Sequence, residues 1–157
     1  MKTIRLATAL AMLAGTPAIA AEYLTELTSD VYQAPGTAQE IAQRAMTCIS
    51  RNLAPGRVDA QLIVSSDLPN GVIVARNALR YGNMPVWEIR STFTFEARDG
   101  RFRIRQSNLE RFNDMAGGWG PIGKWTGSGA SKAEAAFASS ALTVAQCAMS
   151  NSKQDKW

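Results

Sequence analysis

The stretch WEIRSTFTFEARDGRFRIR, residues 87–105, decides the fold. On both sides of Asp99-Gly100, apolar side chains alternate with polar and charged ones, as in a strand with one buried and one solvated face. Asp-Gly is favoured in the two-residue turn that joins twisted antiparallel strands. The stretch therefore predicts a β-hairpin in which Arg98 lies opposite Arg101.

This turn also sets the pairing along the rest of the hairpin. A slip of one residue would move the whole apolar set into water, so the register is strongly specified. The expected cross-strand pairs are Ala97 with Phe102, Glu96 with Arg103, Phe95 with Ile104, and Thr94 with Arg105.

Two further strands are expected before the hairpin, over residues 58–66 and 72–80. The turn between them contains Asn70-Gly71, and both residue types tolerate a positive φ. Together with the hairpin, these strands predict a twisted four-stranded antiparallel sheet.

Amphipathic helices are predicted before and after the strands. Thr37 and Glu40 have the spacing of a capping box, and so do Ser131 and Glu134. An apolar stripe follows each box, so the helices should run to about residues 53 and 149. Because both stripes need an apolar surface to cover, the fold class is α+β with two helices packed on one face of the sheet. The stripes consist of Ile41, Ala45, Cys48 and Ile49, and of Ala133, Phe137, Ala141, Val144 and Ala148.

One cysteine lies on each predicted helix. Cys48 belongs to the first apolar stripe, and Cys147 lies at the flank of the second. Helices that cover the same sheet face are neighbours, and an oxidising compartment favours a disulfide between such cysteines. The alternative is a pair of small buried thiols that never meet. We predict the bridge.

Residues 1–20 have the order of a cleavable signal peptide. Lys2 and Arg5 precede the apolar run 6–14, and Ala18-Ile19-Ala20 is a cleavage site. The apolar run is shorter than the roughly 20 residues that a transmembrane helix needs. We expect cleavage after Ala20, a periplasmic or secreted protein, and no stable membrane insertion afterwards.

Cleavage would change the length and the net charge of the chain. The full sequence has 157 residues and a formal net charge of +4, and removal of residues 1–20 leaves 137 residues and +2. That size suits one domain, expected over residues 37–150, with a lead-in segment at 21–36 and a frayed tail at 151–157. A charge of +2 gives no reason to expect a nucleic-acid partner.

The chain contains no histidine. This excludes serine–histidine–acid triads, cysteine–histidine dyads and histidine-ligated metal sites. Phosphate-binding glycine loops and nucleophile-elbow motifs are also absent from the sequence. We expect no metal, no cofactor and no catalytic residue, with a small histidine-free hydrolase as the alternative from another class.

Three arginines form the first candidate binding surface. Arg101, Arg103 and Arg105 alternate along one strand, so their side chains share the polar face of the hairpin. They could receive an anionic partner. They could equally form a solvated face whose charge is balanced by neighbouring glutamates, since exposed ion pairs contribute only about 0–1 kcal/mol.

The second candidate lies in the glycine-rich stretch 113–130, which predicts a loop. It contains Trp119, Lys124 and Trp125. Exposed tryptophans on a loop could stack on sugar rings or anchor a protein partner. The alternative is that both fold back as a lid over the sheet edge or the core.

The stretch from Ala38 to about Phe112 resembles the TBP-like domain of exported bacterial proteins, domain of unknown function 4468. In that family a helix precedes two strands joined by a short polar turn with glycine, here matched by Asp67 through Val74. A later strand runs into a D-G-R-[YF]-R hairpin, here Asp99 through Arg103. The resemblance implies an α+β fold with a twisted antiparallel sheet and helices on one side. It implies no activity, and the name describes shape rather than DNA binding.

These observations together predict an exported, non-enzymatic binding module. Its partner would be an envelope protein or an anionic or glycan component of the cell surface. An immunity or inhibitor protein directed against a cell-envelope toxin is the alternative.

Overall fold

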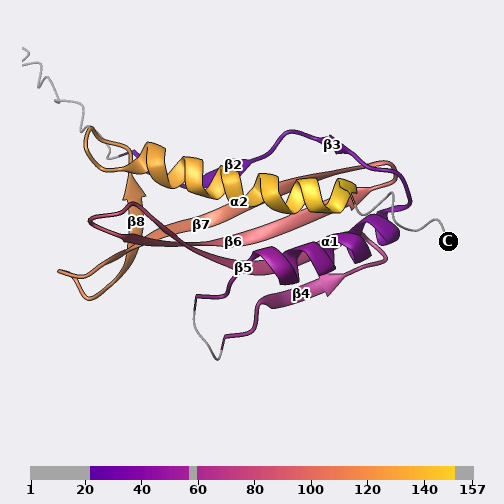
Figure 1. The fold of residues 1–157 in the computed structure, drawn as a ribbon, viewed down its shortest axis with the longest axis horizontal. Helices are drawn as coiled ribbons and strands as arrows, with labels where there is room; N and C mark the ends of the chain where they lie inside the picture. The colour runs from indigo at the N-terminus through magenta and orange to yellow at the C-terminus, as the bar shows by residue number, and fades with distance from the viewer. Residues whose placement is uncertain (1–21, 57–59, 151–157) are drawn as a thin grey trace, which may run out of the picture.

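The computed structural model describes residues 22–56 and 60–150. The expected signal peptide, the start of the expected first strand and the tail at 151–157 lie outside the described residues. Two helices, α1 (Ala38–Asn52) and α2 (Ala130–Ser150), accompany eight strands (Figure 1). The strands are β1 (Tyr23–Leu24), β2 (Glu26–Thr28), β3 (Tyr32–Gln33), β4 (Ile63–Asp67), β5 (Val72–Tyr81), β6 (Trp87–Arg98), β7 (Arg101–Asn113) and β8 (Gly118–Gly123).

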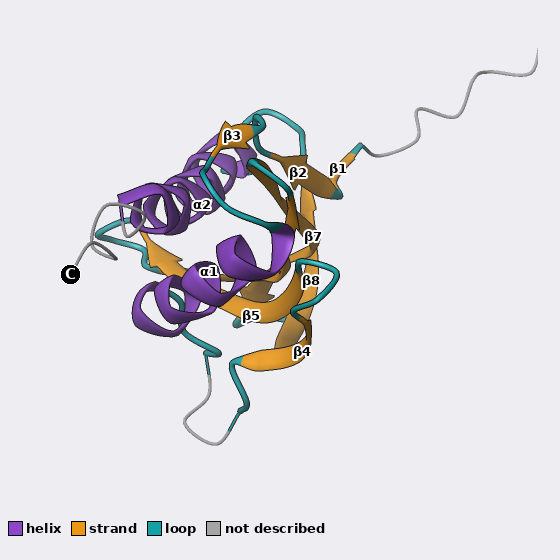
Figure 2. Ribbon diagram, turned by 90° about the vertical axis from the view of Figure 1, so that its right-hand side faces the viewer, coloured by secondary structure: helices purple, strands orange, loops and turns teal. Residues whose placement is uncertain are grey.

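All strand pairs are antiparallel, in the order β1-β8-β7-β6-β5-β4. The sheet curls around α1 and α2, which both lie on one face (Figure 2). The α+β class is therefore confirmed. The expected number of four strands is wrong, because four further strands, β1, β2, β3 and β8, join β4 to β7 in the sheet. No helix of the described segments has both the length and the apolarity to cross a membrane.

The additional strands complete the second edge of β7. This edge pairs in turn with β8, β2 and β3, so the backbone groups of the longest strand are satisfied on both sides. Strands β1, β2 and β3 lie in residues 21–36, which were expected to be a lead-in segment, and β8 lies in the stretch expected to be a loop. These four strands have two to six residues each, which is too few for a clear alternating pattern.

The predicted register is confirmed for the part of the hairpin next to the Asp99-Gly100 turn. Arg98 pairs with Arg101, Phe95 with Ile104, and Glu96 with Arg103. The register then shifts between Arg90 and Thr92, where Asn108 on β7 has a φ of 52°. This bulge adds one residue to β7 and exchanges the faces toward which its later side chains point.

The core lies between the two helices and the sheet. The predicted apolar stripes of both helices are buried. They pack on the helix-facing residues of the central strands, which include Phe93, Phe95 and Phe102. The Phe95 and Phe102 rings stack with centroids 4.7 Å apart. A second cluster joins the first half of α2 to β8 through Phe137 and Ile122.

A buried polar cluster fixes α2 on the sheet. The Asn77 Nδ2 group donates to Gln106 Oε1 at 2.8 Å and to Ser140 Oγ at 2.9 Å. Gln106 Nε2 in turn donates to the Phe137 carbonyl at 2.7 Å. Because these groups are removed from water, they favour the one helix position that pairs them.

The two helix starts differ in how well the sequence predicts them. The first capping box is confirmed, since Thr37 and Glu40 exchange side chain to backbone hydrogen bonds. The second helix begins at Ala130, which places Ser131 inside its first turn rather than at its cap. Ser128 Oγ instead accepts from the Ala130 N–H at 3.3 Å.

The predicted disulfide is confirmed. Cys48 of α1 and Cys147 of α2 are joined with a Cα–Cα distance of 5.8 Å, and 99 positions separate them in sequence. The bridge therefore connects the two helices directly and closes a loop that contains most of the sheet.

Replacing both cysteines with alanine should lower the free energy of unfolding by about 2–4 kcal/mol, because a long loop is no longer closed in the unfolded chain. Denaturant unfolding followed by circular dichroism measures this. A reducing agent should destabilise the parent protein similarly and leave the double variant unaffected. Equal stability of the reduced and oxidised parent protein would contradict the prediction.

The tip of the β6–β7 hairpin is attached to the start of α1. Asp99 Oδ1 accepts from the Ala38 N–H at 2.9 Å, and the Gly36 carbonyl accepts from the Gly100 N–H at 2.9 Å. The carboxylate thus satisfies one of the free N–H groups at the helix N-terminus.

Asp99→Ala should cost about 1 kcal/mol of folding free energy, since it removes a helix-capping acceptor. Asp99→Asn keeps a side-chain oxygen and suits the same turn, so it should cost less than half as much. Urea denaturation of the two variants makes the comparison, and equal losses for both would exclude the capping role.

Candidate functional site: a groove on the helix-free face

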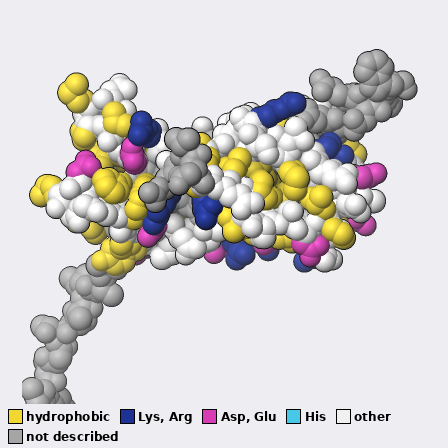
Figure 3. Space-filling model, turned by 90° about the horizontal axis from the view of Figure 1, so that it is seen from below, with side chains coloured by type: hydrophobic (Ala, Val, Ile, Leu, Met, Phe, Trp, Pro, Cys, Tyr) yellow, Lys and Arg dark blue, Asp and Glu magenta, His cyan; other side chains and the backbone are white. Residues whose placement is uncertain are grey.

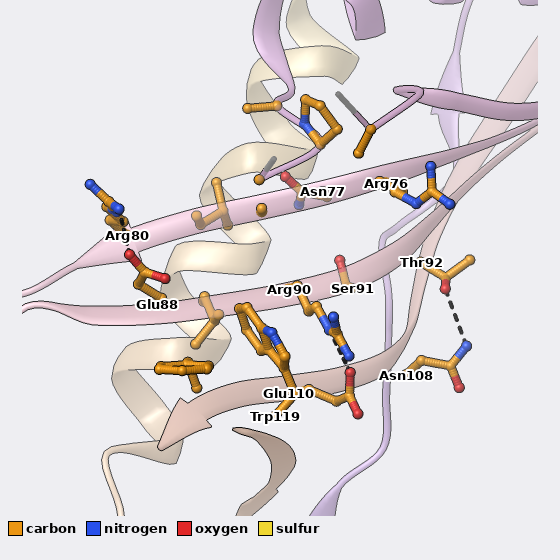
Figure 4. A pocket seen from close by; sticks show the side chains of 18 residues that line it. Arg76, Asn77, Arg80, Glu88, Arg90, Ser91, Thr92, Asn108, Glu110 and Trp119 are labelled. Atoms are coloured by element: carbon orange, nitrogen blue, oxygen red, sulfur yellow. Dashed lines mark hydrogen bonds and ion pairs between the residues drawn. The ribbon is translucent and has the colours of Figure 1, made fainter. Parts of the chain in front are cut away.

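A groove of about 970 Å³ lies on the face of the sheet opposite α1 and α2; we call this the helix-free face. Its floor is formed by the second half of β5, the first half of β6 and the end of β7, and Trp119 of β8 lines one end. Figure 4 shows the lining residues, among which Arg76, Arg90 and Thr92 come from alternate positions of neighbouring strands. These positions point away from the core because the residues between them pack under the helices.

The chain that follows α1 forms one wall of the groove. The Ala78 N–H donates to the Ala54 carbonyl at 2.8 Å, which brings this segment against β5. At Gly56, with φ at +83°, an added Cβ would lie 2.7 Å from the Ala78 Cβ. Glycine and a small floor residue are thus both needed for this close approach.

Three cross-strand rows of side chains make up the floor. The first contains Arg76 and its partner Thr92, whose Oγ1 accepts from Asn108 Nδ2 at 3.1 Å. The second contains Ala78 and Arg90, and Arg90 Nε donates to Glu110 Oε2 at 2.6 Å. The third is the ion pair of Arg80 with Glu88, at 2.5 Å.

An aromatic group closes one end of the groove. The Arg90 guanidinium lies 4.3 Å from the centroid of the Trp119 ring, a cation–π arrangement. The Phe112 ring meets Trp119 edge-on with centroids 5.5 Å apart. Arg90 is therefore held between a carboxylate and an indole, and its guanidinium has a fixed position in the groove.

The groove is close to electrically neutral. Of the described residues that line it, three are arginines and two are glutamates, and both glutamates are in ion pairs. Arg76 donates through Nη1 to the Gln61 carbonyl at 2.6 Å. Within residues 22–56 and 60–150, no group of acidic or cysteine side chains could hold a metal ion.

The predicted arginines lie on the same face as the groove but do not line it. Glu96 binds both Arg103, at 2.7 Å, and Arg105, at 3.5 Å. Arg101 lies at the hairpin end, beside Gln33 of β3. Figure 3 views the molecule from the side of β4, and there too basic and acidic side chains are interspersed instead of forming separate patches. The geometry is that of a face with balanced charge.

The structure separates the residues of the predicted tryptophan loop. Trp119 lies within β8 and lines the groove. Trp125 follows the strand and is 57% exposed. Lys124 Nζ forms an ion pair with Glu22 at 3.1 Å. The two tryptophans thus occupy opposite ends of one short strand rather than a free loop.

Arg90, Glu110, Thr92 and Asn108 were not expected as site residues. Extending the hairpin register without interruption places Arg90 opposite Leu109, whereas the bulge places it opposite Glu110. The available signal was Asn108, a residue type enriched at positive φ, which lies between the buried even positions Phe102 and Ile104 and the buried odd position Leu109.

No family model and no curated protein matches the chain. Its structure is similar to that of a DUF4468 family protein from Bacteroides ovatus ATCC 8483, with 15% sequence identity and a TM-score of 0.49; the match covers 62% of this chain and 60% of that protein's chain. This is the family that the sequence resembles.

Glu96→Gln should strengthen retention on a cation-exchange column. The substitution removes the carboxylate shared by Arg103 and Arg105, so Arg103 loses its glutamate partner and Arg105 keeps only the longer contact to Glu26, at 3.9 Å. The matched control is Glu134→Gln, which makes the same charge change on the exposed side of α2. If both variants elute at the same salt concentration, the arginines are not restrained by Glu96.

Proposed function

We propose that this chain is an exported, non-enzymatic binding module that holds a component of the bacterial cell envelope in the groove of the helix-free face. The groove itself is the observation that carries the proposal. It combines an aromatic end, a floor of side chains already fixed by hydrogen bonds, and a volume in the range of ligand sites.

The state of the charged groups supports binding over catalysis. Glu88 and Glu110 each face an arginine, whereas a general acid or base must be able to exchange its proton with a substrate. An arginine held between Glu110 and Trp119 suits recognition, because its planar donors are oriented before a ligand arrives.

Two features support export. Disulfides persist mainly in oxidising compartments, and the Cys48–Cys147 bridge joins the two helices of the fold. The first described strand begins at Tyr23, three residues after the expected cleavage site. Cleavage after Ala20 would therefore leave β1 available to pair with β8.

Trp119→Ala tests the groove as the binding site. The processed protein is mixed with envelope fractions, and the sedimented share is measured against protein concentration. Because Trp119 forms the aromatic end of the groove, its truncation should weaken binding about tenfold, as for an aromatic residue that contributes strongly to an interface. Trp87→Ala makes the same truncation at a residue outside the groove and should bind as the parent protein does.

Two outcomes would contradict the proposal. Sedimentation that is equally weakened by both variants would exclude the groove as the binding site. Absence of the processed protein from envelope and periplasmic fractions would exclude an envelope partner. Unfolding midpoints of both variants establish that the comparison is made between folded proteins.

A further inference from the structure

We infer that the groove binds an uncharged oligosaccharide, which continues from Trp119 along the outer side of β8 to Trp125. The inference rests on the proposed function and names the class of ligand for the same site. Three observations support it: rings lie in a row on one face of β8, Trp125 packs against this strand at Gly123, and the charged groups of the groove floor are paired.

The rings follow one face of a single strand. Ile122 is buried in the core, so the alternate positions Trp119, Pro121 and Gly123 face outward. Pro121 is exposed and Trp119 is half-buried. The distance along the strand from residue 119 to residue 123 is about 13 Å at roughly 3.3 Å per residue, which exceeds the length of one sugar ring.

The ring of the second tryptophan, Trp125, packs directly on Gly123. A Cβ at this position would lie 1.5 Å from Cζ3 of Trp125, so the indole ring rests where any other residue would place its side chain. The ring is held against the strand and still presents more than half of its surface to solvent. An aromatic surface that is both fixed and exposed suits the apolar face of a sugar ring.

The floor next to Trp119 supplies what sugar hydroxyl groups require. Hydroxyls donate and accept, and the floor offers carboxylate oxygens at Glu110, guanidinium donors at Arg90 and a side-chain amide at Asn108. Glu110 accepts one bond from Arg90, and its two oxygens have further lone pairs available.

Charge favours an uncharged ligand over an anionic one. An anion that approached Arg80 or Arg90 would have to displace Glu88 or Glu110, or remain close to these carboxylates. The third arginine of the groove, Arg76, already donates to the Gln61 carbonyl. Like charges in contact oppose binding. A polar, uncharged ligand adds hydrogen bonds to the existing pairs without breaking them.

The experiment measures affinity for uncharged tetrasaccharides by calorimetry with the processed protein. The probes are chitotetraose, cellotetraose and maltotetraose. We expect at least one to bind, and Trp119→Ala to weaken that affinity about tenfold, as expected for loss of an aromatic contact together with its buried area.

Two glycine variants on β8 distinguish the line of rings from a general effect on the strand. Gly123→Ala must displace the Trp125 ring, and should weaken binding several-fold. Gly120→Ala has open space around the added Cβ and should leave the affinity unchanged. Trp125→Ala removes the ring without changing the strand and should reproduce the effect of Gly123→Ala.

The inference is overturned if none of the three tetrasaccharides binds, or if Gly123→Ala and Gly120→Ala bind alike. It is also overturned if binding is confined to a sulfated tetrasaccharide and is lost at high salt, which would assign the site to the arginines. If no tetrasaccharide binds but the protein still sediments with the envelope in a way that depends on Trp119, only the inferred ligand class is overturned. Tetrasaccharide binding without envelope sedimentation overturns the proposed function.

Discussion

The rest of the structure depends on the pairing of β6 with β7 across the Asp99-Gly100 turn. This hairpin contains the two longest strands of the sheet. The other strands add to it: β5 pairs with β6, while β8, β2 and β3 pair with the other edge of β7. Its tip also holds the start of α1 through Asp99. A shift of this register would turn the core-facing side chains of the hairpin toward solvent and would move Asp99 away from the start of α1.

One irregularity in the hairpin creates the groove. With the register unbroken, Arg90 would lie opposite an apolar residue, and Glu110 would point toward the helices. The bulge at Asn108 reverses the faces for the last third of β7, so Leu109 enters the core and Glu110 meets Arg90. The same reversal places Phe112 beside Trp119. The bulge thus converts the end of a regular sheet into a site with aromatic and charged groups together.

The difference between what the sequence predicts and what it misses follows from the range of the interactions. The turn, the helix stripes and the first capping box depend on residues close in sequence, and the disulfide follows from two helices on one face. By contrast, β1 to β3 have two or three residues each, and their strand character comes entirely from pairing with distant strands. Strand β8 has the sequence GWGPIG, whose composition resembles a loop. Trp119 could therefore be named from the sequence, but its partners Arg90 and Glu110 could not.

The two faces of the sheet have separate roles, and this separation explains why the charges of the helix-free face are paired. The helices, the buried polar cluster and the disulfide all stabilise the opposite face, so the groove side chains are not needed for the core. Exposed ion pairs contribute little to stability. What pairing does provide is orientation: Arg90 is restrained by Glu110 on one side and by Trp119 on the other. A ligand that binds such a preformed set loses less side-chain entropy than one that must order free arginines. In the proposed binding function, a weakly charged floor with oriented donors and acceptors would therefore select ligands by the positions of their hydroxyl and amide groups more than by their net charge.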